Sequence, residues 1–299
     1  MDIFSKITLA DREWARECIE AEHSCSADFS FEGNYIWREE YRQHIAKIND
    51  MLVFRVETDG YGTMFSSPVG MGDRQAAILA IRDICKSEGI KCMICGVTPE
   101  QLEIIKGYDI GKYEIVEMNG ANDYIYEAEK LATLSGKKLH GKRNHINQFE
   151  LAHEWKTVEL THDNIDIALG LAKKWESEAE EITSDMEYES RAMTMAFKEF
   201  NEIGLEGIIL YVDGQPQAFT AGSMITSETV DVHFEKANKD LRGAYPMINR
   251  EFVRYLLGRH PQLKYINRED DMNIEGLRKA KLSYHPAFMV RKHTLIFED

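Results

Sequence analysis

VHFEKANKDLRGAYPMINREFVRYLL, residues 232–257, reads as a strand, a polar loop and a helix. Gly243 lets the backbone come close to a ligand, and Pro246 suits the first turn of a helix, where a missing N–H costs no hydrogen bond. Free N–H groups near Ala244 are therefore placed to face an anion, and Arg242 would add positive charge. The alternative is a helix start that only needs a tight entry, and this stretch alone leaves both interpretations open.

The residues before this loop predict the sheet to which it belongs. Residues 207–238 read as three antiparallel strands. Asp213-Gly214 makes the first tight turn, and Thr226-Ser227 lies in the second. His233, alone in the last strand, is more typical of a packed core histidine than of a catalytic one.

The same plan of elements occurs twice along the chain. Residues 3–22 predict a short strand and then a helix with Thr8 as N-cap and Asp11 three residues on, and residues 154–178 repeat that order. The ends of the two halves also match: helix 76–87, strand 90–96, helix 99–106 and strand 113–118, against helix 246–257, strand 263–267, helix 274–281 and strand 287–297. We therefore expect an α/β (α+β) protein of two similar domains, residues 1–150 and 151–299.

Composition bounds the class of protein. No apolar run approaches the roughly 18 to 20 residues needed to cross a bilayer, and the N-terminus has no signal-like segment, so we expect a cytoplasmic protein without stable membrane insertion. The formal charge of −15 opposes nonspecific binding to nucleic acid or anionic lipid, unless a local basic patch overrides it. Cys92 and Cys95 lie three apart in a predicted strand and point to opposite faces, so no metal site is expected. The oligomeric state is left open.

A basic segment stands at the expected domain boundary. Residues 123–149 concentrate cations in an acidic chain, at Lys130, Lys137, Lys138, Lys142 and Arg143. A solvated helix face with a loop is the ordinary interpretation of such a run. An anion site is the alternative, because Arg143 can fork onto a phosphate or carboxylate while Lys138 and Lys142 add point charge.

A third segment, YINREDDMNIEGLRKAKLSYHP at residues 265–286, gathers polar groups where a predicted strand ends. Ligands in open α/β sheets tend to bind at such ends. Acidic and amide groups there could hold an incoming amine or act as a base, whereas capping of the next helix by Asp271 or Asn273 is the structural alternative. The sequence has no nucleophile elbow, Walker A loop, HExxH motif or dinucleotide fingerprint.

Together with Asp123-Tyr124-Ile125-Tyr126, these three segments resemble the C-terminal domain family of the phosphatidylglycerol lysyltransferases, which is related to the Fem aminoacyltransferases. The resemblance covers nearly the whole chain. It implies two tandem GNAT-like acyltransferase domains with mixed, largely antiparallel sheets. It also implies transfer of an acyl or aminoacyl group from aminoacyl-tRNA or acyl-CoA to an amine or hydroxyl on a small molecule, peptide or lipid headgroup.

Two features depart from that family. The membrane-spanning half of the lysyltransferases has no counterpart in these 299 residues, which weakens the expectation of a phospholipid acceptor. Arg-Gly-Ala at residues 242–244 is a degenerate form of the acetyltransferase pyrophosphate loop. The alternatives are therefore a noncatalytic ligand-binding module that kept the fold and an ordinary CoA-dependent N-acetyltransferase.

The resemblance and the residues together suggest roles. Glu235 is the candidate base or amine holder, with Asp270 behind it, and no covalent intermediate is required. The bland alternative is a surface ion pair of Glu235 with Lys236 or another lysine. Donor phosphate would be held by Arg242, Gly243, Ala244 and Tyr245. The expected substrate or anion-binding set is Lys138, Lys142, Arg143, Asn144, Asn238, Asn267, Lys279 and Tyr284.

Overall fold

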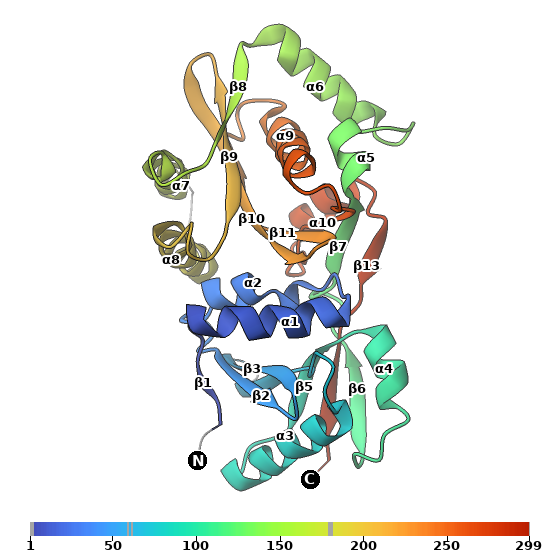
Figure 1. The fold of residues 1–299 in the computed structure, drawn as a ribbon. Helices are drawn as coiled ribbons and strands as arrows, with labels where there is room; N and C mark the ends of the chain where they lie inside the picture. Colours follow the sequence, from blue (N-terminus) through green and yellow to red (C-terminus); the bar gives the residue numbers. More distant parts are fainter. Residues whose placement is uncertain (1–2, 59, 61, 179–181, 299) are drawn as a thin grey trace. The chain divides into compact units, whose positions relative to one another are not determined.

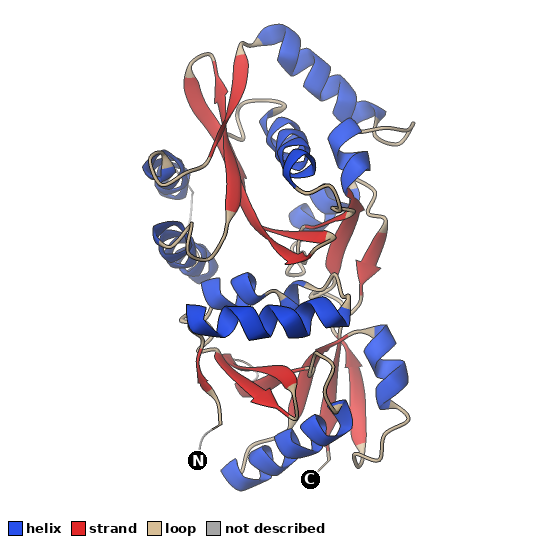
Figure 2. Ribbon diagram, in the orientation of Figure 1, coloured by secondary structure: helices blue, strands red, loops and turns tan. Residues whose placement is uncertain are grey.

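The computed structural model describes residues 3–58, 60, 62–178 and 182–298. The chain forms two compact units. Unit 1 comprises residues 1–124, 269–278 and 289–299, and unit 2 comprises residues 125–268 and 279–288. Each unit has a seven-stranded sheet with helices packed against it (Figure 2).

The sheet of unit 1 has the strand order β1-β2-β3-β4-β5-β14-β6. Its strands are β1 Ser5–Lys6, β2 His44–Ile48, β3 Met51–Thr58, β4 Gly62–Ser66, β5 Met93–Val97, β14 His293–Phe297 and β6 Tyr113–Glu117. Only β4 and β5 pair in parallel. Its helices are η1 Leu9–Asp11, α1 Arg12–Glu22, η2 Ala27–Phe29, α2 Phe31–Ile36, α3 Arg74–Glu88 and α4 Pro99–Ile105.

The sheet of unit 2 has the order β13-β7-β12-β11-β10-β9-β8. Its strands are β13 Phe288–Val290, β7 Asp123–Glu127, β12 Tyr265–Asn267, β11 Thr229–Ala237, β10 Gln215–Thr226, β9 Glu206–Val212 and β8 Trp155–Glu159. Here β11 and β12 form the parallel pair. The helices that follow residue 127 are α5 Ala128–Thr133, α6 His140–Ala152, α7 Ile165–Ser177, α8 Ser184–Lys198, α9 Ala244–Arg259 and α10 Glu275–Leu282.

Both sheets follow one topology, and each takes its sixth strand from the other half of the chain. Five strands in chain order are followed by β14 in unit 1 and by β7 in unit 2. The mixed α/β architecture with two similar units is confirmed.

The structure divides the chain differently from the boundary expected near residue 150. Because β7 pairs with β12, and α5 and α6 pack on α9, residues 125–150 belong to unit 2. The expected strand 287–297 is also two strands, β13 and β14, which join different sheets. An apolar pattern indicates that a segment is extended, but its pairing partner lies far away in sequence.

The predicted hairpins of unit 2 are confirmed. Asp213 and Gly214 have φ of 51° and 80°, the left-handed pair that a two-residue turn between β9 and β10 requires. Ser227 lies in the turn from β10 to β11. Both turns fix the register of the three strands that carry the candidate site.

Helices cover the two faces of this sheet differently (Figure 1). Phe234 of β11 points toward α8, where its ring lies 5.7 Å from that of Phe197. The next residue, Glu235, points to the other face, where it meets Asn249 of α9. Helix α9 packs there because apolar residues recur every three to four positions along it, at Met247, Ile248, Phe252, Val253 and Leu256, all buried.

Candidate functional site

Strands β11 and β12 diverge after a short paired stretch. They pair only from Thr229 with Tyr265 to Asp231 with Asn267, after which β12 ends and β11 continues to Ala237. Glu235 therefore lies beyond the part of β11 that pairs with β12, although it still pairs with Thr220 of β10. Such a divergence in the sheet leaves strand edges available to a ligand instead of to a neighbouring strand.

Glu235 bridges this divergence through two partners. Its Oε1 lies 2.7 Å from Nη2 of Arg268, the first residue after β12, and its Oε2 accepts a 3.0 Å hydrogen bond from Nδ2 of Asn249. The exposed fractions of the Glu235 and Arg268 side chains are 9% and 14%. Lys236 pairs instead with Glu189, so the surface pair of Glu235 with Lys236 is wrong.

Arg268 lies among aromatic rings. Its Cζ is 5.0 Å from the ring centroid of Tyr284 and 5.8 Å from that of Tyr126. Its Nη1 is buried and has no hydrogen-bond acceptor among the residues that the structure describes. The Oδ1 atom of Asn249 is likewise buried without a donor in that part of the chain. One donor, Arg268 Nη1, and one acceptor, Asn249 Oδ1, thus lack partners beside Glu235. Each buried polar atom that stays unpaired costs about 1–3 kcal/mol of stability.

Lys142 joins this cluster from α6. Its Nζ lies 4.1 Å from the ring centroid of Tyr284. Burial lowers the pKa of Lys142, and the positive charge of Arg268 lowers it further, while Glu235 opposes both. Burial raises the pKa of the Tyr284 hydroxyl, which is therefore neutral at physiological pH. Lys142 and Tyr284, both from the predicted binding set, are brought together by the fold.

The other predicted binding residues of the basic segment do not join the Glu235 cluster. The Nη1 atom of Arg143 donates to the backbone oxygens of Leu134 and Gly136, so its guanidinium caps the end of α5. Asn144 is exposed, with Nδ2 3.1 Å from His140 Nε2, and Lys138 is exposed. Consecutive residues on a helix point about 100° apart, which explains why Lys142 enters the cluster and its neighbours do not.

The N-terminus of α9 is open, whereas its counterpart in unit 1 is closed. Both α3 and α9 follow the fourth strand of their sheet and precede the fifth. At α3 the carboxylate of Asp73 accepts a 2.9 Å hydrogen bond from the amide of Ala76. At α9 the N-cap is Gly243, with φ of 98° and no capping side chain. A negative charge already occupies the first site, whereas the second has no capping carboxylate; there the Ala244 amide donates to the backbone oxygen of Leu241, and Pro246 carries no N–H.

The other predicted donor-binding residues surround this opening. Ala244 is buried, and Tyr245 is 44% exposed. The Nη2 atom of Arg242 lies 3.4 Å from Nε2 of His145, and Arg242 is exposed. Burial raises the pKa of the Tyr245 hydroxyl. Arg242 and Tyr245 thus present accessible side chains at the start of α9, whereas Ala244 does not.

Other predicted residues lie elsewhere. Asn238 holds a turn, because its Nδ2 donates to Gln217 and its Oδ1 accepts from the amide of Asp240. Asn267 is fully buried in β12, and Lys279 is exposed on α10. Asn238 is therefore a turn residue, Asn267 a core residue and Lys279 a surface residue.

Asp270 belongs to unit 1, whereas Glu235 belongs to unit 2. Its Oδ1 accepts a 3.0 Å hydrogen bond from the amide of Met272. Burial raises the pKa of Asp270 to about 6, although Lys292 lowers it. The role behind Glu235 therefore stays a prediction.

His233 is a buried core residue. Its Nε2 lies 2.7 Å from Oγ of Ser223, and its Nδ1 lies 3.6 Å from Oδ2 of Asp231. The side chains of Ser223, His233 and Asp231 thus form a chain of contacts like that of a catalytic triad. All three residues, however, are at least 90% buried within the sheet. This burial confirms the interpretation of His233 as a packed histidine.

Sequence reasoning did not assign Arg268, Asn249 or Tyr126 to the site. Arg268 carried a signal, since it directly follows a predicted strand in the polar segment at residues 265–286. Asn249 carried none, and Tyr126 stood out only in the stretch that carries the family resemblance, because their roles depend on the facing of α9 and on the pairing of β7 with β12.

The family "Phosphatidylglycerol lysyltransferase, C-terminal" matches residues 22–296. The chain belongs to this family. A conserved protein of unknown function from Bacteroides thetaiotaomicron is 36% identical, covers 100% of both chains and superposes with a TM-score of 0.94. An uncharacterized protein of Mycoplasmoides gallisepticum is 28% identical over 204 residues, which are 66% of this chain and 62% of that protein.

More distant structures show the fold. The C-terminal domain of a putative lysylphosphatidylglycerol synthetase from Agrobacterium fabrum is 14% identical, with 97% of this chain and 92% of that chain covered and a TM-score of 0.66. A tandem GNAT protein from the clavulanic acid biosynthesis pathway is 9% identical, with 99% and 98% covered and a TM-score of 0.52. This member of the family therefore has a tandem GNAT fold. None of its described helices is long and apolar enough to cross a bilayer.

Proposed function

We propose that unit 2 transfers an acyl or aminoacyl group from an activated, phosphate-bearing donor to an amine or hydroxyl. The observation that carries this proposal is the Glu235–Arg268 pair at the diverging strands, where the buried Nη1 of Arg268 has no acceptor among the described residues. The family and the fold support acyl transfer as the reaction class.

Arg268 is suited to stabilise the transition state. When the acceptor attacks the donor carbonyl, negative charge develops on the carbonyl oxygen. A fixed, partly desolvated donor at that point is worth far more than the same donor in water. Glu235 holds Arg268 Nη2, which leaves Nη1 to the oxyanion.

Asn249 and Lys142 are suited to handle the attacking group. The free Oδ1 of Asn249 can accept a hydrogen bond from the incoming amine or hydroxyl. Both oxygens of Glu235 already accept hydrogen bonds, so Glu235 acts here by orienting Arg268 and Asn249. We assign proton acceptance to Lys142, because its Nζ lies in this cluster over the ring of Tyr284 and burial lowers its pKa.

The open N-terminus of α9 supports the placement of the donor phosphate in unit 2. The positive end of the α9 dipole, which has no capping carboxylate, and the charge of Arg242 suit a phosphate, whereas the Asp73 carboxylate disfavours a phosphate at α3. In both acyl-CoA and aminoacyl-tRNA, the activated acyl group is attached to a carrier that bears phosphates. A net charge of −15 makes the larger polyanion the harder one to bind.

The test is thermal unfolding with CoA, acetyl-CoA and charged tRNA in parallel, followed by assay of donor consumption with amine and hydroxyl acceptors. A true donor at 100 times its Kd should stabilise the protein by about 2.7 kcal/mol and be consumed when acceptor is added. Binding without consumption would favour the noncatalytic module. If none of these donors stabilises the protein, the proposed reaction is contradicted.

A further inference from the structure

A hollow with an empty volume of about 390 Å³ lies between α7 and α8 in unit 2. It opens on the face of the sheet opposite Glu235, because Lys236 of β11 lines it and adjacent strand residues point to opposite faces. The hollow is thus separate from the Glu235 cluster, although Lys236 directly follows Glu235 in β11.

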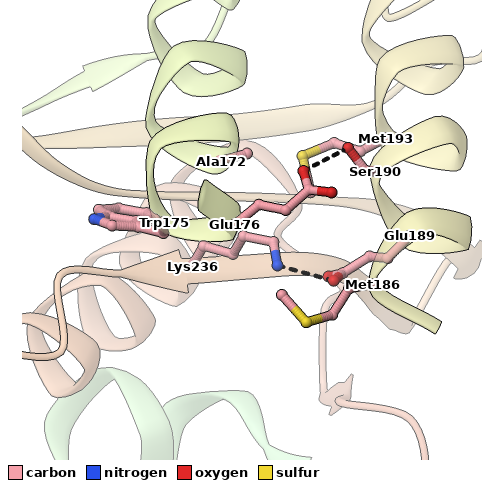
Figure 3. Close-up of a pocket in the computed structure, with 8 residues that line it drawn as sticks. All are labelled: Ala172, Trp175, Glu176, Met186, Glu189, Ser190, Met193 and Lys236. Atoms are coloured by element: carbon pink, nitrogen blue, oxygen red, sulfur yellow. Dashed lines mark hydrogen bonds and ion pairs between the residues drawn. The ribbon is translucent and has the colours of Figure 1, made fainter. Parts of the chain in front are cut away.

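One part of the lining is apolar. Trp175 of α7 stacks on the buried ring of Phe219, with centroids 6.4 Å apart and planes 3° from parallel. Met186 and Met193 of α8 also line the hollow (Figure 3). An indole and two flexible thioethers can accommodate an aliphatic chain of varied shape.

The polar part of the lining carries an excess negative charge. The Nζ atom of Lys236 lies 2.9 Å from Oε2 of Glu189, so these two charges compensate each other. Glu176 accepts a 2.9 Å hydrogen bond from the neutral hydroxyl of Ser190 (Figure 3). Among the lining residues, two carboxylates therefore face one ammonium, and the surplus charge belongs to Glu176.

We propose that this hollow binds a primary aliphatic ammonium compound, with the cation against Glu176 and the hydrocarbon chain against Trp175 and the two methionines. A cation at Glu176 gains a charge-assisted hydrogen bond, and the indole of Trp175 covers the hydrocarbon chain. A neutral alcohol of the same length gains only the apolar contacts. The site goes beyond the proposed transfer reaction, and its test needs no activity.

The probe is n-butylammonium, with n-butanol as its neutral counterpart, titrated into protein labelled with ¹³C at the methionine methyl groups. Met186→Leu and Met193→Leu assign the two reporter signals. We expect both signals to shift saturably with n-butylammonium and to shift much less with n-butanol. Glu176→Gln should weaken binding tenfold or more, because the charged acceptor is lost.

Two variants separate charge from structural damage. Glu187→Gln removes one charge from an exposed position on α8 outside the lining and should leave the affinity unchanged. Lys236→Met removes the compensating cation and should tighten binding several-fold, an effect that a damaged fold would not produce. Equal shifts with n-butanol, shifts that never saturate, or equal weakening by Glu187→Gln and Glu176→Gln would each overturn the proposal.

Discussion

In unit 1, the Nζ atom of Lys292 lies 2.7 Å from Oδ1 of Asp123, and the two side chains are 4% and 1% exposed. A second carboxylate, that of Asp28, lies 2.5 Å from the same nitrogen. Lys292 immediately precedes β14, the strand that the end of the chain contributes to the sheet of unit 1. These ion pairs therefore fix the point at which β14 enters the sheet of unit 1.

Lys292→Met should destabilise the protein by about 3–5 kcal/mol, because it leaves the Asp123 carboxylate buried and uncompensated. The two carboxylates raise the pKa of Lys292, so its stabilisation is complete at neutral pH and is lost only as strongly alkaline pH approaches that raised pKa. Urea unfolding at pH 7 measures the difference. Lys91→Met, at an exposed position, is the control and should change the stability by less than about 0.5 kcal/mol.

Asp270→Asn should stabilise the protein at pH 8 but not at pH 3.5. Burial raises the folded-state pKa of Asp270 to about 6 from an ordinary value of 3.8. A raised carboxyl pKa contributes stability below the unfolded pKa that is lost as the pH rises through the folded one. The gain at pH 8 is at most about 3 kcal/mol. Unfolding curves for both proteins at the two pH values test this, and a gain that is independent of pH would contradict it.

Gly243→Ala should destabilise the protein, whereas Gly258→Ala on the same helix should not. At Gly243 the left-handed φ of 98° strains any other residue, and an added Cβ would lie 3.1 Å from Cδ2 of Phe149. At Gly258 an added Cβ meets nothing within 4 Å. We expect a loss of about 1–2 kcal/mol at the first position and a gain of up to about 1 kcal/mol at the second. Thermal unfolding of the matched pair gives the comparison, and equal effects would remove the special role of the α9 entry.

Lys142→Arg tests whether Lys142 accepts a proton or only supplies charge. Arginine keeps the positive charge but does not lose its proton, so turnover should fall by about 10²-fold or more if Lys142 is the base. Lys130→Arg, at an exposed position of the same basic segment, should leave turnover unchanged. Turnover near that of the wild type in Lys142→Arg would reassign Lys142 to anion binding.

Much of the local structure could be predicted from the sequence, because turns and helix starts depend on neighbouring residues. The Asp213-Gly214 turn and the strand, loop and helix at residues 232–257 are examples. The exchange of β7 and β14 could not be predicted, since either strand has an apolar pattern that suits both sheets.

The candidate site was predictable only in part. Glu235 and Lys142 were identified, but the partners that define their chemistry come from distant segments. Arg268 is 33 residues from Glu235 in sequence. Lys142 of α6 contacts the ring of Tyr284, which lies in the segment after α10. Arg143 carries the same charge as Lys142, but the phase of α6 directs it to backbone carbonyls.

The most direct test of the proposed reaction is the turnover of Glu235→Gln with the donor and acceptor identified by the binding screen. Glutamine keeps the shape but loses the charge that holds Arg268, so turnover should fall by about 10²-fold or more. Glu228→Gln, in the β10–β11 turn, should keep full turnover, because its carboxylate contacts only the exposed Lys264 among charged groups that the structure describes. Turnover of folded Glu235→Gln within a few-fold of the wild type would contradict the central claim that this pair organises the chemistry.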